Sequence, residues 1–336
     1  MPAPADAEPA ADAALLVADL GGTHARFGIW HQRRMHAVQV LRCADYHDLA
    51  AAAGQYLASQ RVAGQLPAPA CGVFAVATPL AGDHIALTNN SWNFSAATTR
   101  RALKLERLVF LNDFTALALA VPQLSAGDRR QVGGGAPLAD GPIAVVGPGT
   151  GLGVSGLVRA GERWLALQSD GGHVTLPATT PRESAVIAAL RRQYPHVSAE
   201  RMLCGQGLML LYRTLAELDG VSVEALAAEE ITRRAVGDGE QRCRETLAMF
   251  CAWLGNVAGN LALTLDARGG VYIGGGIVPL LGPYFDASPF RQCFEAKGRY
   301  AALLTAIPVY IITAENPALI GCVQALSNLS PRVEAG

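Results

Sequence analysis

The chain has 336 residues, of which 51% are hydrophobic and 16% are charged, and its formal net charge is −1. This composition excludes a disordered chain, and the length suits one large domain or two ordinary ones. A net charge near zero gives no general attraction to nucleic acid or to an anionic membrane, so neither is expected as a partner.

The cysteines and the N-terminal residues indicate in which cellular compartment the protein is expected. Seven cysteines are scattered without any C-x-x-C pair, which suits reduced thiols better than a disulfide framework or a zinc site. Residues 1–14 are rich in Ala, Pro and acidic residues and lack a basic region, so we expect a disordered tail rather than a signal peptide. We find no stretch of ~18 uncharged apolar residues that would span a membrane. We therefore expect a soluble, cytoplasmic protein.

Residues 15–30 predict a strand, a tight turn at Gly21 and Gly22, and a second strand. Asp19 and Thr23 place a carboxylate and a hydroxyl on either side of the turn. Backbone N–H groups at such a turn can bind a phosphate while the carboxylate holds a metal ion. An ordinary hairpin has the same pattern, so both interpretations stay open at this point.

The next elements alternate between strands and helices. We expect strands at 37–42, 72–77, 85–88 and 108–111, and helices at 46–59, from Ser95 to about 103, and at 115–121. Three early strands followed by this alternation are the order of one lobe of an actin-like (ribonuclease-H-like) ATPase, an α/β fold.

Asn112 and Asp113 stand between a predicted strand and a predicted helix. In an open α/β sheet such a junction faces the crevice where ligands bind. Asp113 could then be a general base, with Asn112 positioning a substrate hydroxyl beside it. The alternative is that both residues only cap the helix, for which Asn and Asp are preferred.

A second lobe follows a break in composition at 124–141, which is rich in Gly, Ser and Asp. We expect a small α/β domain from 15–123 plus 314–336 and a large α/β domain from 124–313. Residues 143–155 repeat the plan of strand, glycine-rich turn and strand, with Thr150 in the turn. Two such hairpins at the head of successive lobes suggest a nucleotide whose phosphates lie between the lobes.

Three polar residues of the second lobe are candidates for a binding site. Asp170 and His173 are separated by two glycines after a predicted strand at 164–168, so both can face one pocket. A turn histidine bonded to a carbonyl is the alternative, and zinc is disfavoured because no cysteines follow at ligand spacing. Glu200 lies in the first turn of a helix that opens at Ser198, where the helix dipole favours a carboxylate whatever the function.

The remaining chain supplies a glycine triplet. Predicted helices at 183–193 and 240–265 precede a strand that starts at 270 and ends at Gly274, Gly275 and Gly276. Such a triplet lets a flat adenine or a ribose approach the backbone, although it can equally be a loop. A strand at 308–313 and a helix at 318–326 complete the chain, and we expect this helix to pack on the first lobe.

Six motifs in this order resemble those of the bacterial-type ATP-dependent glucokinases, in the hexokinase branch of the actin-like ATPase superfamily. The similarity extends over residues 15–326, and the motifs are Asp19-Leu-Gly-Gly-Thr23, Leu111-Asn-Asp-Phe114, Gly147-Pro-Gly-Thr-Gly-Leu-Gly153, Gly171-Gly-His173, Ser198-Ala-Glu-Arg201 and Gly274-Gly-Gly-Ile-Val-Pro279.

The resemblance implies a two-lobed fold with an interlobe cleft, a homodimer, and transfer of the γ-phosphate of ATP to the 6-hydroxyl of glucose with Mg²⁺. Asp113 would accept the hydroxyl proton, and Asp19 would hold Mg²⁺ through water. The implied sugar-binding residues are Asn112, Asp170, His173 and Glu200. The implied nucleotide-binding residues are Asp19, Gly21, Gly22, Thr23, Gly149, Thr150, Gly151, Gly274, Gly275 and Gly276.

Two positions depart from the family pattern. His24 stands where the family usually has Asn, and could disturb the first turn. Asp170 stands where the family usually has Glu, and its carboxylate would reach ~1 Å less far, a misplacement that can cost ~10²-fold in rate. This leaves open a kinase for another hexose, such as mannose, fructose or an amino sugar, or a catalytically weakened sugar-binding regulator.

Overall fold

The computed structural model describes residues 13–64, 66–80, 82–87 and 90–328. They form two compact units, one within Met1–Leu124, Ala160–Ala166 and Glu315–Gly336, and one within Ser125–Arg159 and Leu167–Ala314. Most of the predicted tail at 1–14 and the end of the predicted small domain lie outside the described residues. The predicted domain boundaries stay a prediction.

The first unit is built on a five-stranded sheet with the order β3-β2-β1-β4-β7. Its strands are β1 (Leu15–Leu20), β2 (His24–His31), β3 (Arg34–Arg42), β4 (Cys71–Val76) and β7 (Arg107–Asn112). Strands β1, β4 and β7 are parallel, whereas β2 and β3 form an antiparallel meander. The register aligns Leu20 with Val76 and Val76 with Asn112. Asp19 and Asp113 therefore lie at the same carboxyl edge of the sheet.

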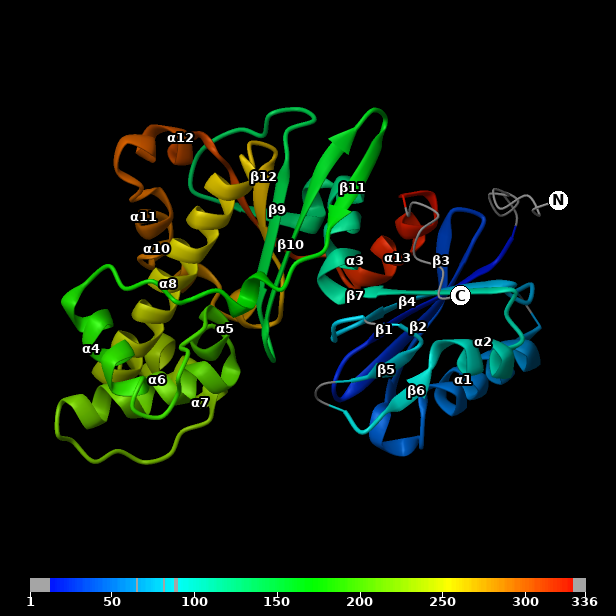
Figure 1. Ribbon diagram of the computed structural model, residues 1–336, viewed down its shortest axis with the longest axis horizontal. Helices are drawn as coiled ribbons and strands as arrows, with labels where there is room; N and C mark the ends of the chain where they lie inside the picture. Colours follow the sequence, from blue (N-terminus) through cyan, green and yellow to red (C-terminus); the bar gives the residue numbers. More distant parts are fainter. Residues whose placement is uncertain (1–12, 65, 81, 88–89, 329–336) are drawn as a thin grey trace. The chain divides into compact units, whose positions relative to one another are not determined.

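Helices cover both faces of this sheet, with α1 (Leu49–Ala63) and α2 (Ala96–Leu103) on one face and α3 (Asp113–Ala120) and α13 (Pro317–Asn328) on the other (Figure 1). The helix expected at 46–59 begins later, because the Asp48 carboxylate caps it by accepting a hydrogen bond from the Ala51 N–H at 2.8 Å. It ends at Gly64, whose φ of +66° suits glycine. The short strands β5 (His84–Ala86) and β6 (Asn93–Ser95) pair separately, and Ser95 caps α2 as predicted.

Helix α13 packs directly on α3, as expected from the sequence. A Cβ atom on Gly321 would lie 1.7 Å from the carbonyl oxygen of Ala116, so the two helix backbones touch. The thiol of the next residue, Cys322, donates to the carbonyl oxygen of Ala18 at 3.5 Å. The C-terminal helix thereby anchors the middle of α3 and the end of β1, which carry Asp113 and Asp19.

The second unit is built on a six-stranded sheet with the order β11-β10-β9-β12-β13-β8. Its strands are β8 (Arg129–Val132), β9 (Ile143–Pro148), β10 (Leu152–Ala160), β12 (Gly270–Ile273) and β13 (Val309–Ile312). The edge strand β11 (Arg163–Leu167) completes this sheet, although most of it falls in the range Ala160–Ala166 that is counted with the first unit. Strands β9, β12 and β13 are parallel, while β10 and β8 run antiparallel to their partners. This repeats the plan of the first unit with β8 added. The sequence did not predict β8, because Arg129-Arg-Gln-Val132 is too polar to stand out as a strand.

Helices of the second unit are α4 (Pro181–Leu190), α5 (Ala199–Met202), α6 (Gly205–Leu218), α7 (Ala228–Arg233), α8 (Gln241–Leu265), α9 (Ile277–Leu280), α10 (Pro283–Ala287), α11 (Phe290–Glu295) and α12 (Ala301–Ala306). Single helical turns occupy Cys43–Asp45, Val121–Gln123, Ala126–Asp128, Gly171–His173 and Gly298–Tyr300, and a π-helix occupies Arg234–Asp238.

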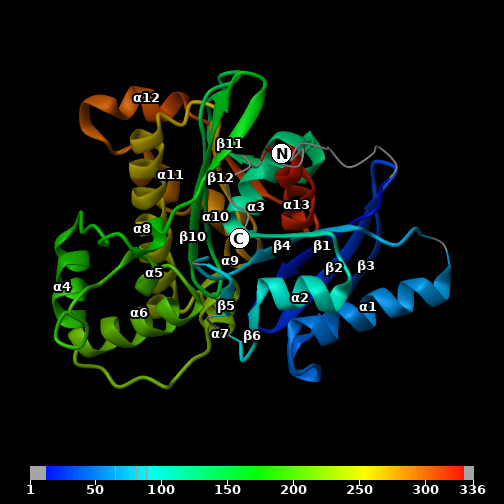
Figure 2. The same cartoon turned by 45° about the vertical axis from the view of Figure 1, so that its right-hand side comes forward.

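Helix α8 is the core helix of this unit and lies beside α11 (Figure 2). The expectation that no stretch could span a membrane is wrong for α8, since it is long and apolar enough by composition. Most of its apolar stretch is buried within the unit, and its own Trp253 is fully buried, as are Phe290 and Phe294 of the neighbouring α11. This burial is typical of the core helix of a globular unit.

Candidate active site

In the first unit, Asn112 is the last residue of β7 and Asp113 is the first residue of α3. The Asn112 Oδ1 atom accepts hydrogen bonds from the N–H groups of Phe114 at 2.9 Å and Thr115 at 3.2 Å. Asn112 therefore caps the start of α3, while its predicted contact with a substrate stays a prediction. Asp113 is the first residue of α3, and its Oδ1 atom accepts from the Phe114 N–H at 2.9 Å.

The carboxyl group of Asp113 has an unusual proton affinity. Its pKa is raised to about 7, first by burial and second by the charge of Asp19, while hydrogen bonds from Phe114 and Asn112 oppose the rise. A carboxyl with a pKa near neutrality can both accept and release a proton at physiological pH. This is the property required of a general base.

Asp19 has a partner that the sequence analysis missed. The register of the first hairpin places Asp19 opposite Arg26, and the Arg26 Nη1 atom lies 3.3 Å from the Asp19 Oδ2 atom. Burial raises the pKa of Asp19, and the Arg26 guanidinium partly counters that rise. Counting residues across the Gly21 and Gly22 turn would have predicted this pair, because the strands on either side are antiparallel.

The turn of the first hairpin is closed in spite of His24. The Gly21 N–H donates to the carbonyl oxygen of His24 at 3.0 Å, so the backbone of His24 completes the turn. The carbonyl oxygen of Thr23 accepts from the Cys43 N–H at 2.9 Å, while the side chains of Thr23 and His24 are exposed. Substitution of the family's usual Asn by His has therefore not opened this turn.

The second glycine turn lies beside the glycine triplet within the second unit. Its closing hydrogen bond runs from the Gly149 N–H to the Gly151 carbonyl oxygen at 2.8 Å, and Thr150 is exposed between them. Gly275 has a φ of +77°, and a Cβ atom there would lie 2.3 Å from the carbonyl oxygen of Pro148. Only glycine fits this approach, which brings the two glycine-rich segments together.

Glu200 and His173 also meet in the second unit. The Glu200 Oε2 atom accepts from the Leu152 N–H at 2.9 Å, and its Oε1 atom lies 3.7 Å from the His173 Nδ1 atom. Asp170 precedes the helical turn Gly171–His173, and its carbonyl oxygen accepts from the His173 N–H at 2.9 Å. The side chains of Asp170 and His173 are exposed, and that of Glu200 is half-buried.

The donor atoms of the first unit suit Mg²⁺. No cluster of three or more His, Cys, Asp or Glu side chains occurs in the part of the chain that the structure describes. Mg²⁺ is commonly bound by one or two carboxylates with phosphate oxygens and water, rather than by an all-protein cage. Two carboxylates of raised pKa, Asp19 and Asp113, form a donor set of this kind at one sheet edge.

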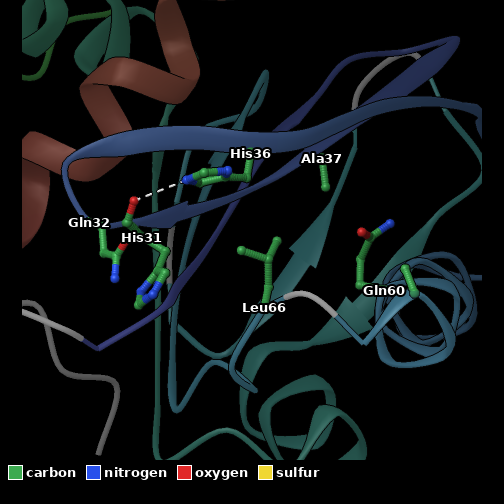
Figure 3. Close-up of a pocket in the computed structure, with 7 residues that line it drawn as sticks. His31, Gln32, His36, Ala37, Gln60 and Leu66 are labelled. Atoms are coloured by element: carbon green, nitrogen blue, oxygen red, sulfur yellow. Dashed lines mark hydrogen bonds between the residues drawn. The ribbon is translucent and has the colours of Figure 1, made fainter.

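A pocket of about 450 Å³ lies elsewhere in the first unit, between the β2–β3 turn and the end of α1 (Figure 3). It is lined by His31, Gln32, His36, Ala37, Gln60, Ala63 and Leu66. None of the predicted site residues is among them. Because β2 runs antiparallel to β1, this pocket lies at the end of the hairpin opposite the Gly21 and Gly22 turn. Ligands of open α/β sheets bind at the carboxyl ends of the strands, so this pocket is not the candidate active site.

Comparison with known proteins decides the family. A glucokinase family model matches residues 16–329 of the chain. A glucokinase of Aromatoleum aromaticum is 50% identical over 315 residues, which cover 93% of this chain and 94% of that one. The chain belongs to the glucokinase family.

Solved structures agree with this membership. A glucokinase from an Antarctic psychrotroph has a TM-score of 0.83 at 34% identity, covering 94% of this chain and 99% of that one. A glucokinase from Streptomyces griseus, solved in complex with glucose and AMPPNP, has a TM-score of 0.60 at 17% identity, covering 92% and 97%, which is a likeness of fold. The predicted actin-like ATPase fold class and the predicted ATP-dependent glucokinase function are confirmed.

Proposed function

We propose that this glucokinase transfers the γ-phosphoryl group of ATP to the 6-hydroxyl of glucose with Asp113 as its general base and with Mg²⁺. The raised pKa of Asp113 at the carboxyl edge of the sheet is the observation that carries the proposal. The relative from Streptomyces griseus supports the choice of ligands, because it was solved with glucose and an ATP analogue.

In the proposed reaction the Asp113 carboxylate takes the proton of the sugar 6-hydroxyl as that oxygen attacks the γ-phosphorus. A new O–P bond forms, the bond between the γ-phosphorus and the bridging oxygen breaks, and ADP leaves. Phosphoryl transfer depends mostly on positioning and charge neutralisation, so one placed base and a neutralised phosphate suffice.

Sugar recognition is proposed for Asn112, Asp170, His173 and Glu200. A polyhydroxylated ring needs several donors and acceptors together, and each buried polar group left unpaired costs ~1–3 kcal/mol. The proximity of His173 to Glu200 supports their assignment to one ligand. Because Asp170 is shorter than the family's usual Glu, another hexose remains the alternative substrate.

Nucleotide recognition is proposed for the glycine turns. The backbone of Gly21, Gly22 and Thr23, and that of Gly149, Thr150 and Gly151, would bind the phosphates, while Gly274, Gly275 and Gly276 would adjoin the adenosine. Asp19 would hold Mg²⁺ through water, and the bound ion would neutralise charge on the transferring phosphate.

We also propose a cytoplasmic homodimer with no nucleic-acid or membrane partner. All seven cysteines are free thiols, which suits a reducing compartment. The dimer rests on the family resemblance, and analytical ultracentrifugation at micromolar concentration tests it directly.

Replacement of Asp113 tests its proposed role as the general base. Asp113→Asn removes the proton acceptor while keeping nearly the same shape, so kcat should fall by ~10²–10⁴-fold. Glucose affinity, measured by calorimetry, should stay close to that of the unaltered protein. Turnover retained in this variant would exclude Asp113 as the base.

A panel of hexoses at fixed ATP distinguishes the alternatives with the unaltered protein. We expect glucose to have the highest kcat/KM. A higher value for mannose, fructose or an amino sugar would establish the other hexose kinase, and glucose binding without turnover would establish the regulator.

A further inference from the structure

The glycine turn at Gly149–Gly151 is held at both ends by one short stretch of chain. The carbonyl oxygen of Gly149 accepts from the N–H of Gly205, the first residue of α6, at 3.1 Å. At the other end, the N–H of Leu152 donates to the Glu200 Oε2 atom of α5 at 2.9 Å. The segment that carries the proposed sugar ligand Glu200 therefore also fixes the proposed phosphate loop.

The two glycines of this turn differ in what surrounds them. A Cβ atom on Gly151 would lie 2.5 Å from the Glu200 Oε2 atom and 3.2 Å from its Cδ atom. A Cβ atom on Gly149 would meet nothing closer than the Gly276 N atom at 4.0 Å. Gly151 thus leaves space for the Glu200 carboxylate, whereas Gly149 has no such neighbour.

Leu152 is also in contact with the other sugar-binding segment. A Cβ atom on Gly172 would lie 2.1 Å from the Leu152 carbonyl oxygen, so the helical turn that ends at His173 packs against that carbonyl. The N–H of Leu152 is thus bonded to the Glu200 carboxylate, and the carbonyl oxygen of Leu152 packs against Gly172. Both segments proposed to bind the sugar therefore contact the residue that follows the phosphate loop.

We propose that Glu200 is a positioning residue for the phosphate loop as well as a hexose ligand, so that hexose and nucleotide binding are coupled through Leu152. The inference rests on the proposed function for the sugar side of the coupling. A sugar hydroxyl bonded to Glu200 restricts the carboxylate, and the carboxylate restricts the Leu152 N–H at the end of the loop. Such coupling is reciprocal, so each ligand strengthens the binding of the other by the same factor.

The decisive measurement is nucleotide affinity in the absence of sugar. Glu200→Ala removes the acceptor for the Leu152 N–H, and Glu200→Gln keeps a carbonyl oxygen that can accept the same bond. Calorimetry with AMPPNP and Mg²⁺ should show a loss of affinity on the order of tenfold for Glu200→Ala and close to none for Glu200→Gln. Both variants should bind glucose more weakly.

A matched pair of glycine variants tests the same contact from the loop. Gly151→Ala should displace Glu200 and weaken glucose binding about fivefold or more in the absence of nucleotide. Gly149→Ala adds the same methyl group to the same loop where no side chain is near, so it should lower glucose affinity less than Gly151→Ala does. Circular dichroism and thermal melting check the folding of all four variants, and the Glu200 pair decides the matter if Gly151→Ala is unstable.

Two outcomes would overturn the inference. One is Glu200→Ala with unaltered nucleotide affinity and weakened glucose binding, which would make Glu200 a sugar ligand only. The other is an equal loss of glucose affinity in Gly151→Ala and Gly149→Ala. Failure of the proposed function is a different result, namely no phosphorylation of any hexose by the unaltered protein.

Discussion

The two glycine hairpins occupy the same place in two sheets of the same plan but carry different chemical groups. In the first unit the next-to-last residue of β1, Asp19, is paired with Arg26. In the second unit the next-to-last residue of β9, Gly147, is paired with Gly153. A carboxylate and a guanidinium in one hairpin are thus replaced by two glycines in the other.

The two hairpins also differ in the charged and backbone groups that lie near their turns. The first sheet edge also carries Asp113, so two carboxylates of raised pKa lie near each other. The second turn is bordered by backbone groups of Gly205 and Gly275, and its nearest carboxylate, Glu200, is already bonded to Leu152. The first unit therefore has two carboxylates and a guanidinium at its sheet edge, whereas the turn of the second unit is surrounded mainly by backbone groups.

Among changes to the hairpins themselves, the largest effect is expected from removing the Asp19 carboxylate, which the second hairpin lacks. Asp19→Asn should lower kcat/KM by ~10²–10³-fold, because it removes the proposed ligand to Mg²⁺ while leaving the strand intact. It should also lower the pKa of Asp113 from its value of about 7, since the Asp19 charge contributes to that rise.

Both consequences can be measured. Steady-state kinetics over a range of Mg²⁺ concentrations gives the first, and carboxyl ¹³C NMR titration of the ligand-free protein gives the second. If the pKa of Asp113 stayed unchanged in Asp19→Asn, the two carboxylates would be independent, and the contrast between the hairpins would lose its electrostatic basis.

A smaller effect is expected on stability. The pKa of Asp113 is about 7 in the folded chain, above the usual unfolded value of about 3.9. The folded state therefore holds this proton more tightly, and the stability that results is fully present below pH 4 and is lost as the pH rises through 7. The loss is on the order of 2 kcal/mol, once solvent access to the half-buried group is allowed for.

Urea denaturation at several pH values measures this loss. Asp113→Asn has no proton to release, so its stability should fall less than that of the unaltered protein between pH 4 and pH 7. Parallel curves for the two proteins would show that Asp113 is not the source of the pH dependence.

Local patterns in the sequence predicted the features that local forces determine. Glycine turns between apolar strands gave both hairpins, and the step from an apolar strand to Asn112 gave the start of α3. The contact of Glu200 with Leu152 joins residues 48 positions apart through a backbone N–H, and no side-chain pattern records such a bond. The strand β8 was missed for a related reason, because its partner β13, and not its own composition, makes it a strand.

The smallest effect is expected from lengthening Asp170, which tests whether the second unit tolerates a longer carboxylate at this position. Asp170 lies before the helical turn Gly171–His173, and its side chain is exposed, so there is room for one more methylene. Asp170→Glu restores the length usual in the family and advances the carboxylate by ~1 Å, so it should lower the KM for glucose a few-fold with little change in kcat.

Asp170→Asn keeps the length and removes the charge, and should raise the KM for every hexose that is phosphorylated. Initial rates for glucose, mannose and fructose with both variants distinguish the effect of the side-chain length at position 170 from the effect of its charge. If Asp170→Glu raised the KM for glucose or left its preference over mannose unchanged, the shorter residue would not be what sets the sugar preference.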